Sequence, residues 1–293
     1  MRKLVLGLLT FAMCWFAAYA ARAAEVRPPE KAVAGEGAKI ATSGDGNATF
    51  FLIGPGNIVK QKIQLGRDVE LSADDLRAAG EYVAVVRSSG ESVTAKFYVA
   101  AAKPAQINFL ARPSRVPAAK EGVVSGVAFV FDAYNNLVLQ PANVKFDLSL
   151  ADAPPISRSV SSKAGIAWTH MDSGKKQGAA QFVASIPEIS AVQSVRRVVQ
   201  QVAADACNLH FAAQRSGDRI AVTTDPIRDC AGNPLPDGTI VTFTQVDERG
   251  RSTVDSRIKR GVARADLPAA GKATISVAAG VVMGNEVQLG GAQ

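Results

Sequence analysis

The 293-residue sequence has few aromatic and few charged residues. Aromatic residues make up 6% of the chain and charged residues 20%, whereas apolar residues reach 47%. This apolar share excludes a disordered chain, because disordered chains lack the side chains that a core requires. Lys and Arg are interleaved with Asp and Glu along the chain, without the concentrated basic stripe that follows a phosphate backbone. We therefore expect no nucleic-acid binding.

Sequence motifs that carry enzyme chemistry are missing. The chain has no G-x-S-x-G elbow, no H-E-x-x-H, no P-loop and no paired-cysteine zinc pattern. Its two histidines, His170 and His210, stand in strand-like surroundings without a cluster of catalytic partners. We predict that the chain is not an enzyme, and we expect no cofactor.

Long apolar runs are missing beyond the first 23 residues. Two basic residues precede an apolar run from Leu4 to Ala18, which is short for a membrane span. Small residues follow, with Ala21-Arg22-Ala23 as the expected cleavage site and Ala18-Tyr19-Ala20 as the alternative. The pattern predicts a signal peptide at residues 1–23, and an uncleaved membrane anchor is the alternative interpretation.

The chain after the predicted leader is mildly basic. The leader contains Arg2, Lys3 and Arg22 and no acidic residue, so its removal lowers the formal net charge from +7 to +4. We expect no transmembrane segment in this mature chain. The predicted location is the periplasm, the cell surface or the extracellular space.

Cysteine is scarce, and its number is informative. Cys14 lies in the predicted leader, which leaves Cys207 and Cys230. An even number of cysteines in an exported chain predicts one disulfide. Closing this loop would stabilise the folded state by about 3 kcal/mol in the chain-entropy estimate. Two free buried thiols are the alternative.

Helical patterns are also scarce, and short alternating runs dominate. Val144 to Leu150 alternates apolar and polar residues, as a half-buried strand does. Turn signals such as Gly54-Pro55-Gly56-Asn57 separate these runs, whereas Ser72 to Ala79 is compatible with one short helical turn. Strands at this spacing predict an all-β fold of sandwiches or barrels.

The domain organisation follows from breaks in these runs. Residues 24–36 carry two consecutive prolines and mixed charge, so we expect a tether there. Three domains are then expected at residues 37–102, 103–203 and 204–293, and the resemblances described below imply that each is an immunoglobulin-like sandwich.

An internal repeat supports this division. Asp132 to Leu137 aligns without gaps to Asp229 to Pro234, and the same register pairs Phe146 with Phe243. Asp can bond its own backbone two residues on, a glycine such as Gly232 accepts a positive φ, and proline fixes the exit from the turn.

The second copy resembles a known family. Asp229 to Thr244 is similar to the signature of invasin/intimin-type (Big-1-like) bacterial immunoglobulin-like domains, in which Asp precedes a Gly-Asn-Pro turn and a V-x-F strand. Asp132 to Phe146 resembles a degraded copy of it. The resemblance covers residues 104–293 and implies tandem sandwiches used either as spacers or as binding tips. It also implies structural roles for Asp132, Asn136, Asp229, Gly232, Asn233 and Pro234.

The first domain lacks this signature. Asp75 to Val85 resembles the tyrosine corner of immunoglobulin-like sandwiches, in which the Tyr82 hydroxyl would bond to the backbone a few residues upstream. An ordinary half-buried strand tyrosine is the alternative.

Two further side-chain groups are open to more than one interpretation. Asp225, Asp229 and Asn233 offer oxygen ligands that suit calcium, although turn formation explains the same residues. Trp168 is either a core residue or an exposed ligand platform. We expect it in the core, because large aromatic side chains are mostly buried.

These observations favour a non-enzymatic, exported structural or interaction protein of the bacterial cell envelope. Its expected partner is a protein of the envelope or the extracellular surface. We predict that binding uses an edge of the first domain, because an unpaired sheet edge accepts a further strand. The alternatives are an adhesin-like binder of surface or host glycans or proteins, which exposed aromatic residues would favour, and an accessory or inhibitor module of an exported enzyme.

Overall fold

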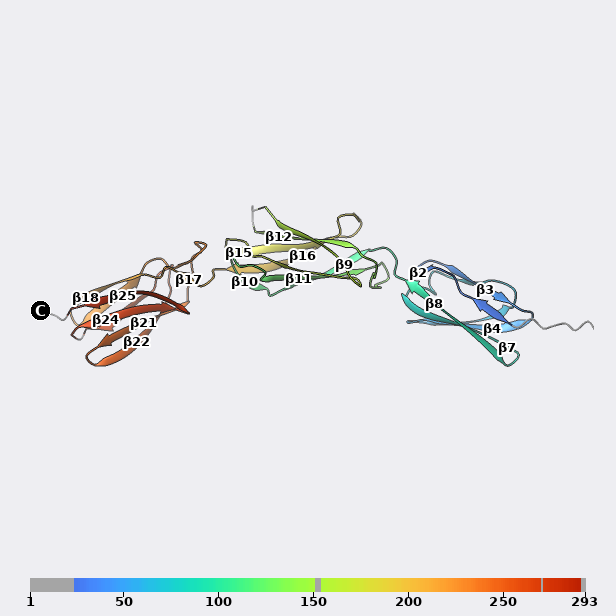
Figure 1. Ribbon diagram of the computed structural model, residues 1–293, viewed down its shortest axis with the longest axis horizontal. Coiled ribbons are helices and arrows are strands. Elements are labelled where there is room, and N and C mark those ends of the chain that lie inside the picture. Colours follow the sequence, from blue (N-terminus) through green and yellow to red (C-terminus); the bar gives the residue numbers. More distant parts are fainter. Residues whose placement is uncertain (1–23, 151–153, 270, 291–293) are drawn as a thin grey trace, which may run out of the picture. The chain divides into compact units, whose positions relative to one another are not determined.

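The computed structural model describes residues 24–150, 154–269 and 271–290. Every regular element in these residues is a β-strand, which confirms the all-β prediction. The chain divides into two compact units, Met1–Ala102 and Lys103–Gln293 (Figure 1). The predicted signal peptide lies outside the described residues. Nowhere in the described ranges is there a helix with the length and apolar character of a membrane span.

The first unit is a sandwich of two sheets, called sandwich 1. The smaller sheet has the order β1–β3–β6, with β1 (Glu25–Arg27), β3 (Ala38–Ser43) and β6 (Val69–Leu71). The larger has the order β2–β8–β7–β4–β5, with β2 (Ala32–Val33), β8 (Glu91–Ala100), β7 (Gly80–Ser88), β4 (Asn47–Ile53) and β5 (Ile58–Gln64). Alternate side chains of both sheets, including Ile40, Phe50 and Leu71, meet in one core.

Residues 24–36 are part of sandwich 1, so the expectation of a tether is corrected. Strand β1 pairs antiparallel with β3, and its Val26 side chain is buried in the core. Strand β2 pairs in parallel with β8 of the other sheet. Pro28 and Pro29 lie between the two short strands, where the chain crosses from one sheet to the other. Strand pairing and burial hold this segment in place, although its two prolines and mixed charge had suggested a tether.

The second unit begins with an eight-stranded sandwich, called sandwich 2. One sheet has the order β10–β16–β15–β12–β13 and the other β14–β11–β9. The strands are β9 (Gln106–Arg112), β10 (Arg115–Pro117), β11 (Val124–Phe131), β12 (Asn143–Leu150), β13 (Ile156–Ser161), β14 (Ile166–Met171), β15 (Gly178–Ser185) and β16 (Val195–Val202). Phe109, Phe146 and Phe182 meet between the sheets, with 4.9 Å between the ring centroids of Phe109 and Phe182.

The remaining strands form sandwich 3. Its sheets have the orders β18–β19–β23 and β22–β21–β24–β25, with a two-stranded β17–β20 pair beside them. The strands are β17 (Ala206–Cys207), β18 (Phe211–Ser216), β19 (Arg219–Thr224), β20 (Arg228–Asp229), β21 (Ile240–Asp247), β22 (Gly250–Arg257), β23 (Arg264–Pro268), β24 (Ala273–Ala279) and β25 (Val282–Leu289). We propose that sandwiches 2 and 3 are the second and third domains, joined at residues 203 and 204.

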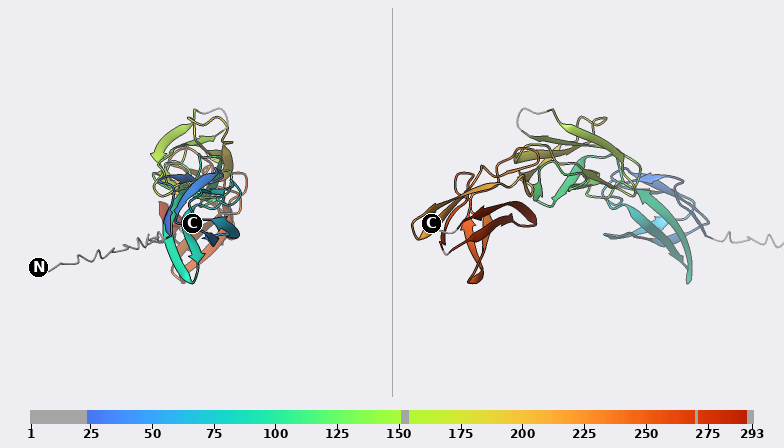
Figure 2. Two further views of the ribbon diagram at one scale, coloured as in Figure 1. Left: turned by 90° about the vertical axis from the view of Figure 1, so that its right-hand side faces the viewer. Right: turned by 60° about the vertical axis from the view of Figure 1, so that its left-hand side comes forward.

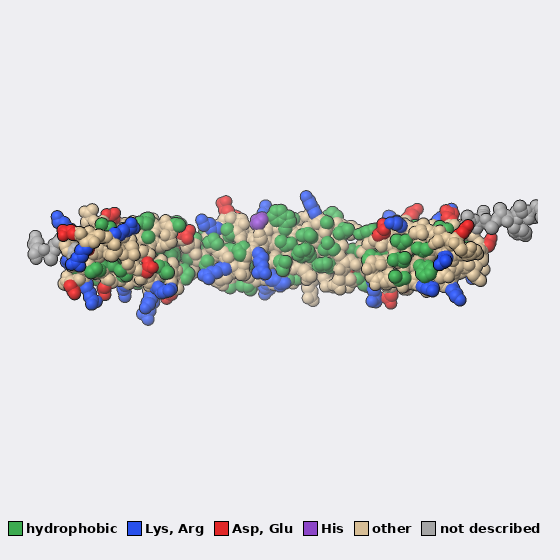
Figure 3. All heavy atoms as spheres, turned by 90° about the horizontal axis from the view of Figure 1, so that it is seen from below, with side chains coloured by type: hydrophobic (Ala, Val, Ile, Leu, Met, Phe, Trp, Pro, Cys, Tyr) green, Lys and Arg blue, Asp and Glu red, His purple; other side chains and the backbone are tan. Residues whose placement is uncertain are grey.

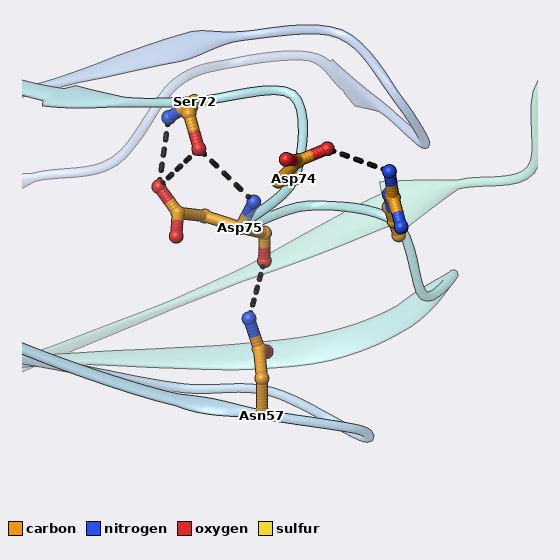
Figure 4. A network of polar contacts seen from close by, with 5 residues as sticks. Asn57, Ser72, Asp74 and Asp75 are labelled. Carbon is orange, nitrogen blue, oxygen red and sulfur yellow. Dashed lines mark hydrogen bonds and ion pairs between the residues drawn. The ribbon is translucent and has the colours of Figure 1, made fainter.

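A hydrogen-bonded loop closes one end of sandwich 1 (Figure 4). The backbone N–H and hydroxyl of Ser72 donate to Oδ2 of Asp75, at 2.8 and 2.7 Å, and the Asp75 N–H donates back to the hydroxyl. The Asn57 side chain, from the turn between β4 and β5, donates to the Asp75 carbonyl at 3.0 Å. The expected helical turn is therefore a hydrogen-bonded loop that also fixes the β4–β5 turn.

Tyr82 lies directly after this loop. Its hydroxyl donates to the Ala78 carbonyl at 3.0 Å, and its buried ring stacks on Phe97 with 5.6 Å between centroids. Gly54 backs the ring, and a Cβ atom at that position would overlap it. The Tyr82 ring therefore leaves no space for a side chain at position 54, in the turn between β4 and β5.

We predict that Gly54→Ala destabilises the first unit by roughly 1–3 kcal/mol, because it overpacks the Tyr82 ring. The matched control is Gly56→Ala in the same turn, where a Cβ atom would make only an ordinary 3.8 Å contact with Ala78. Urea denaturation of the two variants measures the difference. Equal stabilities would contradict the close packing.

Candidate interaction surfaces and the joint between sandwiches 2 and 3

The carboxylate of Asp229 accepts four hydrogen bonds at the end of sandwich 3. Oδ1 accepts the N–H groups of Ala231 and Asn233, at 3.0 and 2.8 Å. Oδ2 accepts the Asn233 side-chain amide at 2.9 Å and the N–H of Ala204, in the segment from sandwich 2, at 3.0 Å. Gly232 supplies the positive φ of 85° that the turn requires. One side chain thus holds both the turn and the connecting segment.

Asp132 organises the same turn in sandwich 2. Its Oδ1 accepts the N–H groups of Tyr134 and Asn136 at 2.8 and 2.9 Å, and its Oδ2 accepts the Asn136 side-chain amide at 2.8 Å. Asn135 takes the positive-φ position, with φ 66°. Asn tolerates this conformation better than other residues with a side chain. The internal repeat in the sequence therefore corresponds to a repeated hydrogen-bond pattern.

Asn233 also reaches across to sandwich 2. Its Oδ1 accepts the Gln177 N–H at 3.0 Å, and its Nδ2 donates to the Lys175 carbonyl at 2.8 Å. Together with the bond to Asp229, these contacts use the amide oxygen and both amide hydrogens of a buried side chain. They join the loop between β14 and β15 to the turn of sandwich 3. The sequence predicted a turn role and a candidate calcium ligand at Asn233, but not these contacts with sandwich 2.

The surroundings of Asp229 lower its pKa. Burial is the largest influence and raises the pKa, but the hydrogen bonds from Asn233 and from backbone N–H groups together outweigh it. The folded chain therefore binds this proton less readily than the unfolded chain. The hydrogen-bonded carboxylate stabilises the fold above the ordinary aspartate pKa of about 3.9, and the contribution is lost as the pH falls through the lower folded value.

A disulfide joins Cys207 and Cys230, which confirms the prediction from the cysteine count. Cys207 belongs to β17, and Cys230 follows Asp229 in the hydrogen-bonded turn. The bond therefore ties the first strand of sandwich 3 to the turn that contacts sandwich 2. We propose that it stiffens this joint.

Two of the three candidate calcium ligands accept hydrogen bonds from N–H groups. The Asp229 oxygens and the Asn233 Oδ1 face N–H donors, whereas Asp225 is exposed. Within the described ranges, His, Cys, Asp and Glu form no group of three that could hold a metal ion. Of the histidines, His210 is exposed, and His170 has its Nδ1 2.9 Å from the Ser125 hydroxyl.

The outer face of the β14–β11–β9 sheet exposes several apolar side chains, Trp168 among them, which corrects the expectation that Trp168 lies in the core. Trp168 is 61% exposed and lies in a cross-strand row with Val127 and Leu110, the last of which is 52% exposed. Ile166 and Phe129 occupy the next row. Figure 3 shows apolar side chains gathered on this part of the chain. Trp168 points outward because its neighbours Ala167 and Thr169 take the buried positions.

The larger sheet of sandwich 1 also exposes apolar side chains on its outer face. Ile58 and Ile53 lie opposite each other on β5 and β4 and are 71% and 43% exposed, and Tyr98 on β8 is 54% exposed. Lys60 and Lys62 follow Ile58 along β5, which is the last strand of the sheet. Figure 2 gives further views of both units. This face thus combines apolar area with positive charge.

Comparison with known proteins supports the fold assignment. No protein-family model matches the chain, and no curated protein matches it. Among solved structures, the Escherichia coli adhesin FdeC is similar at 15% identity with a TM-score of 0.65, over 92% of this chain and 97% of FdeC. Yersinia pseudotuberculosis InvD is similar at 12% identity with a TM-score of 0.51, over 91% of this chain and 96% of InvD. Both are bacterial immunoglobulin-like domain proteins, and this chain shares their tandem fold.

We predict that replacing both cysteines of the disulfide by serine destabilises sandwich 3 by about 3 kcal/mol, because the unfolded chain regains the entropy of an open loop. Amide hydrogen exchange in β21 and β24 of the full chain reports this change residue by residue. Unchanged exchange would show that the disulfide has no role in the stability of sandwich 3.

We predict that Asp229→Asn lowers the stability of sandwich 3 by roughly 1–3 kcal/mol at pH 6, because an amide cannot accept the same four bonds. The loss should shrink as the pH falls from the ordinary aspartate pKa through the lower folded pKa of Asp229, because wild-type Asp229 then becomes protonated as well. Urea denaturation followed by methyl signals of Ile220 and Ile275 measures it. The exposed Asp237→Asn is the control, and a pH-independent loss would contradict the assignment.

Proposed function

We propose that this chain is a non-enzymatic, exported interaction protein of the bacterial cell envelope that binds a protein partner through sandwich 1. The leader pattern, the disulfide and the tandem sandwiches support export and a binding role. FdeC, whose fold is similar, is an adhesin, and this likeness also supports binding rather than catalysis.

The outer face of sandwich 1 carries the proposal. Large apolar side chains at Ile58 and Ile53 are exposed there beside Lys60 and Lys62, at a sheet edge. Contiguous exposed apolar area with a polar rim is typical of protein contact sites, because its burial in a complex is favourable. A sandwich used only as a spacer has no need for such a face.

In-cell crosslinking of the tagged full chain in its native host tests this function. We expect one envelope partner near stoichiometric recovery, and at least fivefold less recovery with Ile53→Ser plus Ile58→Ser. The control is Ile240→Ser plus Val246→Ser, which removes two residues of similar type that are 48% exposed on sandwich 3. Loss of the partner with the control variant only, or recovery of no partner, would contradict the proposal.

An adhesin-like glycan binder is the second candidate, and the exposed Trp168 favours it. Aromatic faces bury well against apolar ligand surfaces, and polar side chains such as His170 and Ser125 lie beside the tryptophan row. A glycan array distinguishes this candidate. Binding by the wild type that Trp168→Ala abolishes, and that the exposed-residue control Tyr98→Ala retains, would establish it in place of the protein-partner function.

A further inference from the structure

We propose that the free edge of β5 accepts an extended, acidic segment of the protein partner as an additional strand of the larger sheet of sandwich 1. The inference rests on the proposed function and specifies which kind of partner segment binds. The segment would alternate carboxylate and apolar side chains. Three observations on β5 lead to it, namely its open backbone groups, its charge and its two-sided side-chain pattern.

The open edge of β5 has a definite set of unpaired backbone groups. Among the described residues, β5 pairs only with β4. The Gly54 N–H donates to the Asn57 carbonyl at 3.0 Å and the Leu65 N–H to the Gly46 carbonyl at 2.9 Å, which fixes the register at both ends of the pair. Antiparallel pairs alternate, so Val59, Gln61 and Ile63 bond to β4. The N–H and C=O groups of Ile58, Lys60, Lys62 and Gln64 therefore face the open edge.

The positive charge beside this edge is uncompensated within the sheet. Lys62 lies opposite Thr49, which lies opposite Arg87, and Lys60 lies opposite Phe51, over whose ring its amine stands at 5.6 Å. In the described part of the chain, Lys60, Lys62 and Arg87 take part in no ion pair, whereas Lys96 on β8 pairs with Glu81 at 2.9 Å. Carboxylates on an added strand would supply the missing partners, because opposite charges directly across two strands attract.

The same lysines disfavour a second copy of this chain at the edge. Antiparallel pairing of two β5 strands centred on Gln61 would place Lys60 of one copy opposite Lys62 of the other. Like charges directly opposite are destabilising, and lysine is a common device against edge-to-edge pairing. Carboxylates on an acidic strand would attract the same lysines, so the edge favours an acidic partner over a second copy of β5.

The opposite side of β5 indicates the remaining side chains of the segment. Val59 and Ile63 are half-buried at the rim of the core of sandwich 1. Side chains of an added strand alternate between the two faces of the sheet. Residues between the carboxylates would therefore lie beside Val59 and Ile63, where apolar side chains would extend the core.

Peptide binding to the full chain, purified after export, tests the inference by NMR. The probe is a seven-residue peptide of alternating valine and glutamate. A glutamine counterpart tests charge, and a counterpart with alternate N-methylated amides tests strand addition. We expect amide shifts at Lys60 and Lys62 with the acidic peptide, and roughly tenfold weaker binding of each counterpart. Equal binding of the glutamine or the N-methylated peptide would overturn the proposal.

Charge reversal provides the second arm of the test. Lys60→Glu plus Lys62→Glu should weaken binding of the acidic peptide at least tenfold. Arg251→Glu plus Lys259→Glu, at exposed positions of sandwich 3, should leave it unchanged. Anionic phosphatidylglycerol vesicles serve as the competing probe. Binding to vesicles through the two lysines, without peptide binding, would make this edge a membrane contact and overturn the proposal.

The in-cell experiment separates this inference from the proposed function. If Ile53→Ser plus Ile58→Ser loses the partner and Lys60→Glu plus Lys62→Glu retains it, the function stands and the acidic strand is wrong. If both variants lose it, both proposals are supported.

Discussion

Aspartate carboxylates that accept backbone N–H groups hold the second unit together. Asp229 fixes the path of its own turn, and this path aims the Asn233 amide at Lys175 and Gln177 of sandwich 2. The same carboxylate holds the N–H of Ala204, where the chain enters sandwich 3. Charge-assisted bonds of this kind are stronger than neutral ones, so a few of them set both a turn and a joint. Burial of the carboxylate is tolerated because its oxygens have N–H partners.

Features that depend on neighbours in sequence were predictable. The Asp132 and Asp229 turns lie within five residues each, and the alternation of β12 places Val144 and Phe146 in the core as the sequence indicates. Features that depend on distant partners were not. The contacts of Asn233 join residues far apart along the chain, which no local pattern encodes. Trp168 was wrongly predicted to be buried. Side chains alternate between the two faces of β14, and Ala167 and Thr169 take the buried positions, so Trp168 faces outward although tryptophan is usually buried.

The outer faces of sandwiches 1 and 2 differ in a way that matters for recognition. The face with Trp168 is built on strands β9, β11 and β14, which contain no Asp or Glu and one Arg, Arg112, and it exposes Trp168 and Leu110. The face of sandwich 1 combines Ile53 and Ile58 with uncompensated cations. Exposed apolar side chains suit a ligand held mainly by buried apolar area, whereas a charged edge with open backbone groups fixes the register and direction of a bound strand. One chain therefore offers two chemically distinct surfaces.

The parallel pairs β2–β8 and β10–β16 have a consequence for the order in which the chain folds. In sandwich 1, Ala32 near the start lies opposite Val99 at the end, and in sandwich 2, Arg115 lies opposite Gln200. A ribosome releases the early strand of each pair long before the late one. Neither larger sheet can therefore close until its final strand has been synthesised. Such non-local pairings form slowly, because the intervening loop must be ordered first. Each of these two sandwiches can therefore complete its larger sheet only when its last strand is present. A chain truncated before β8 or β16 would lack the strand that joins β2 or β10 to the rest of the sheet.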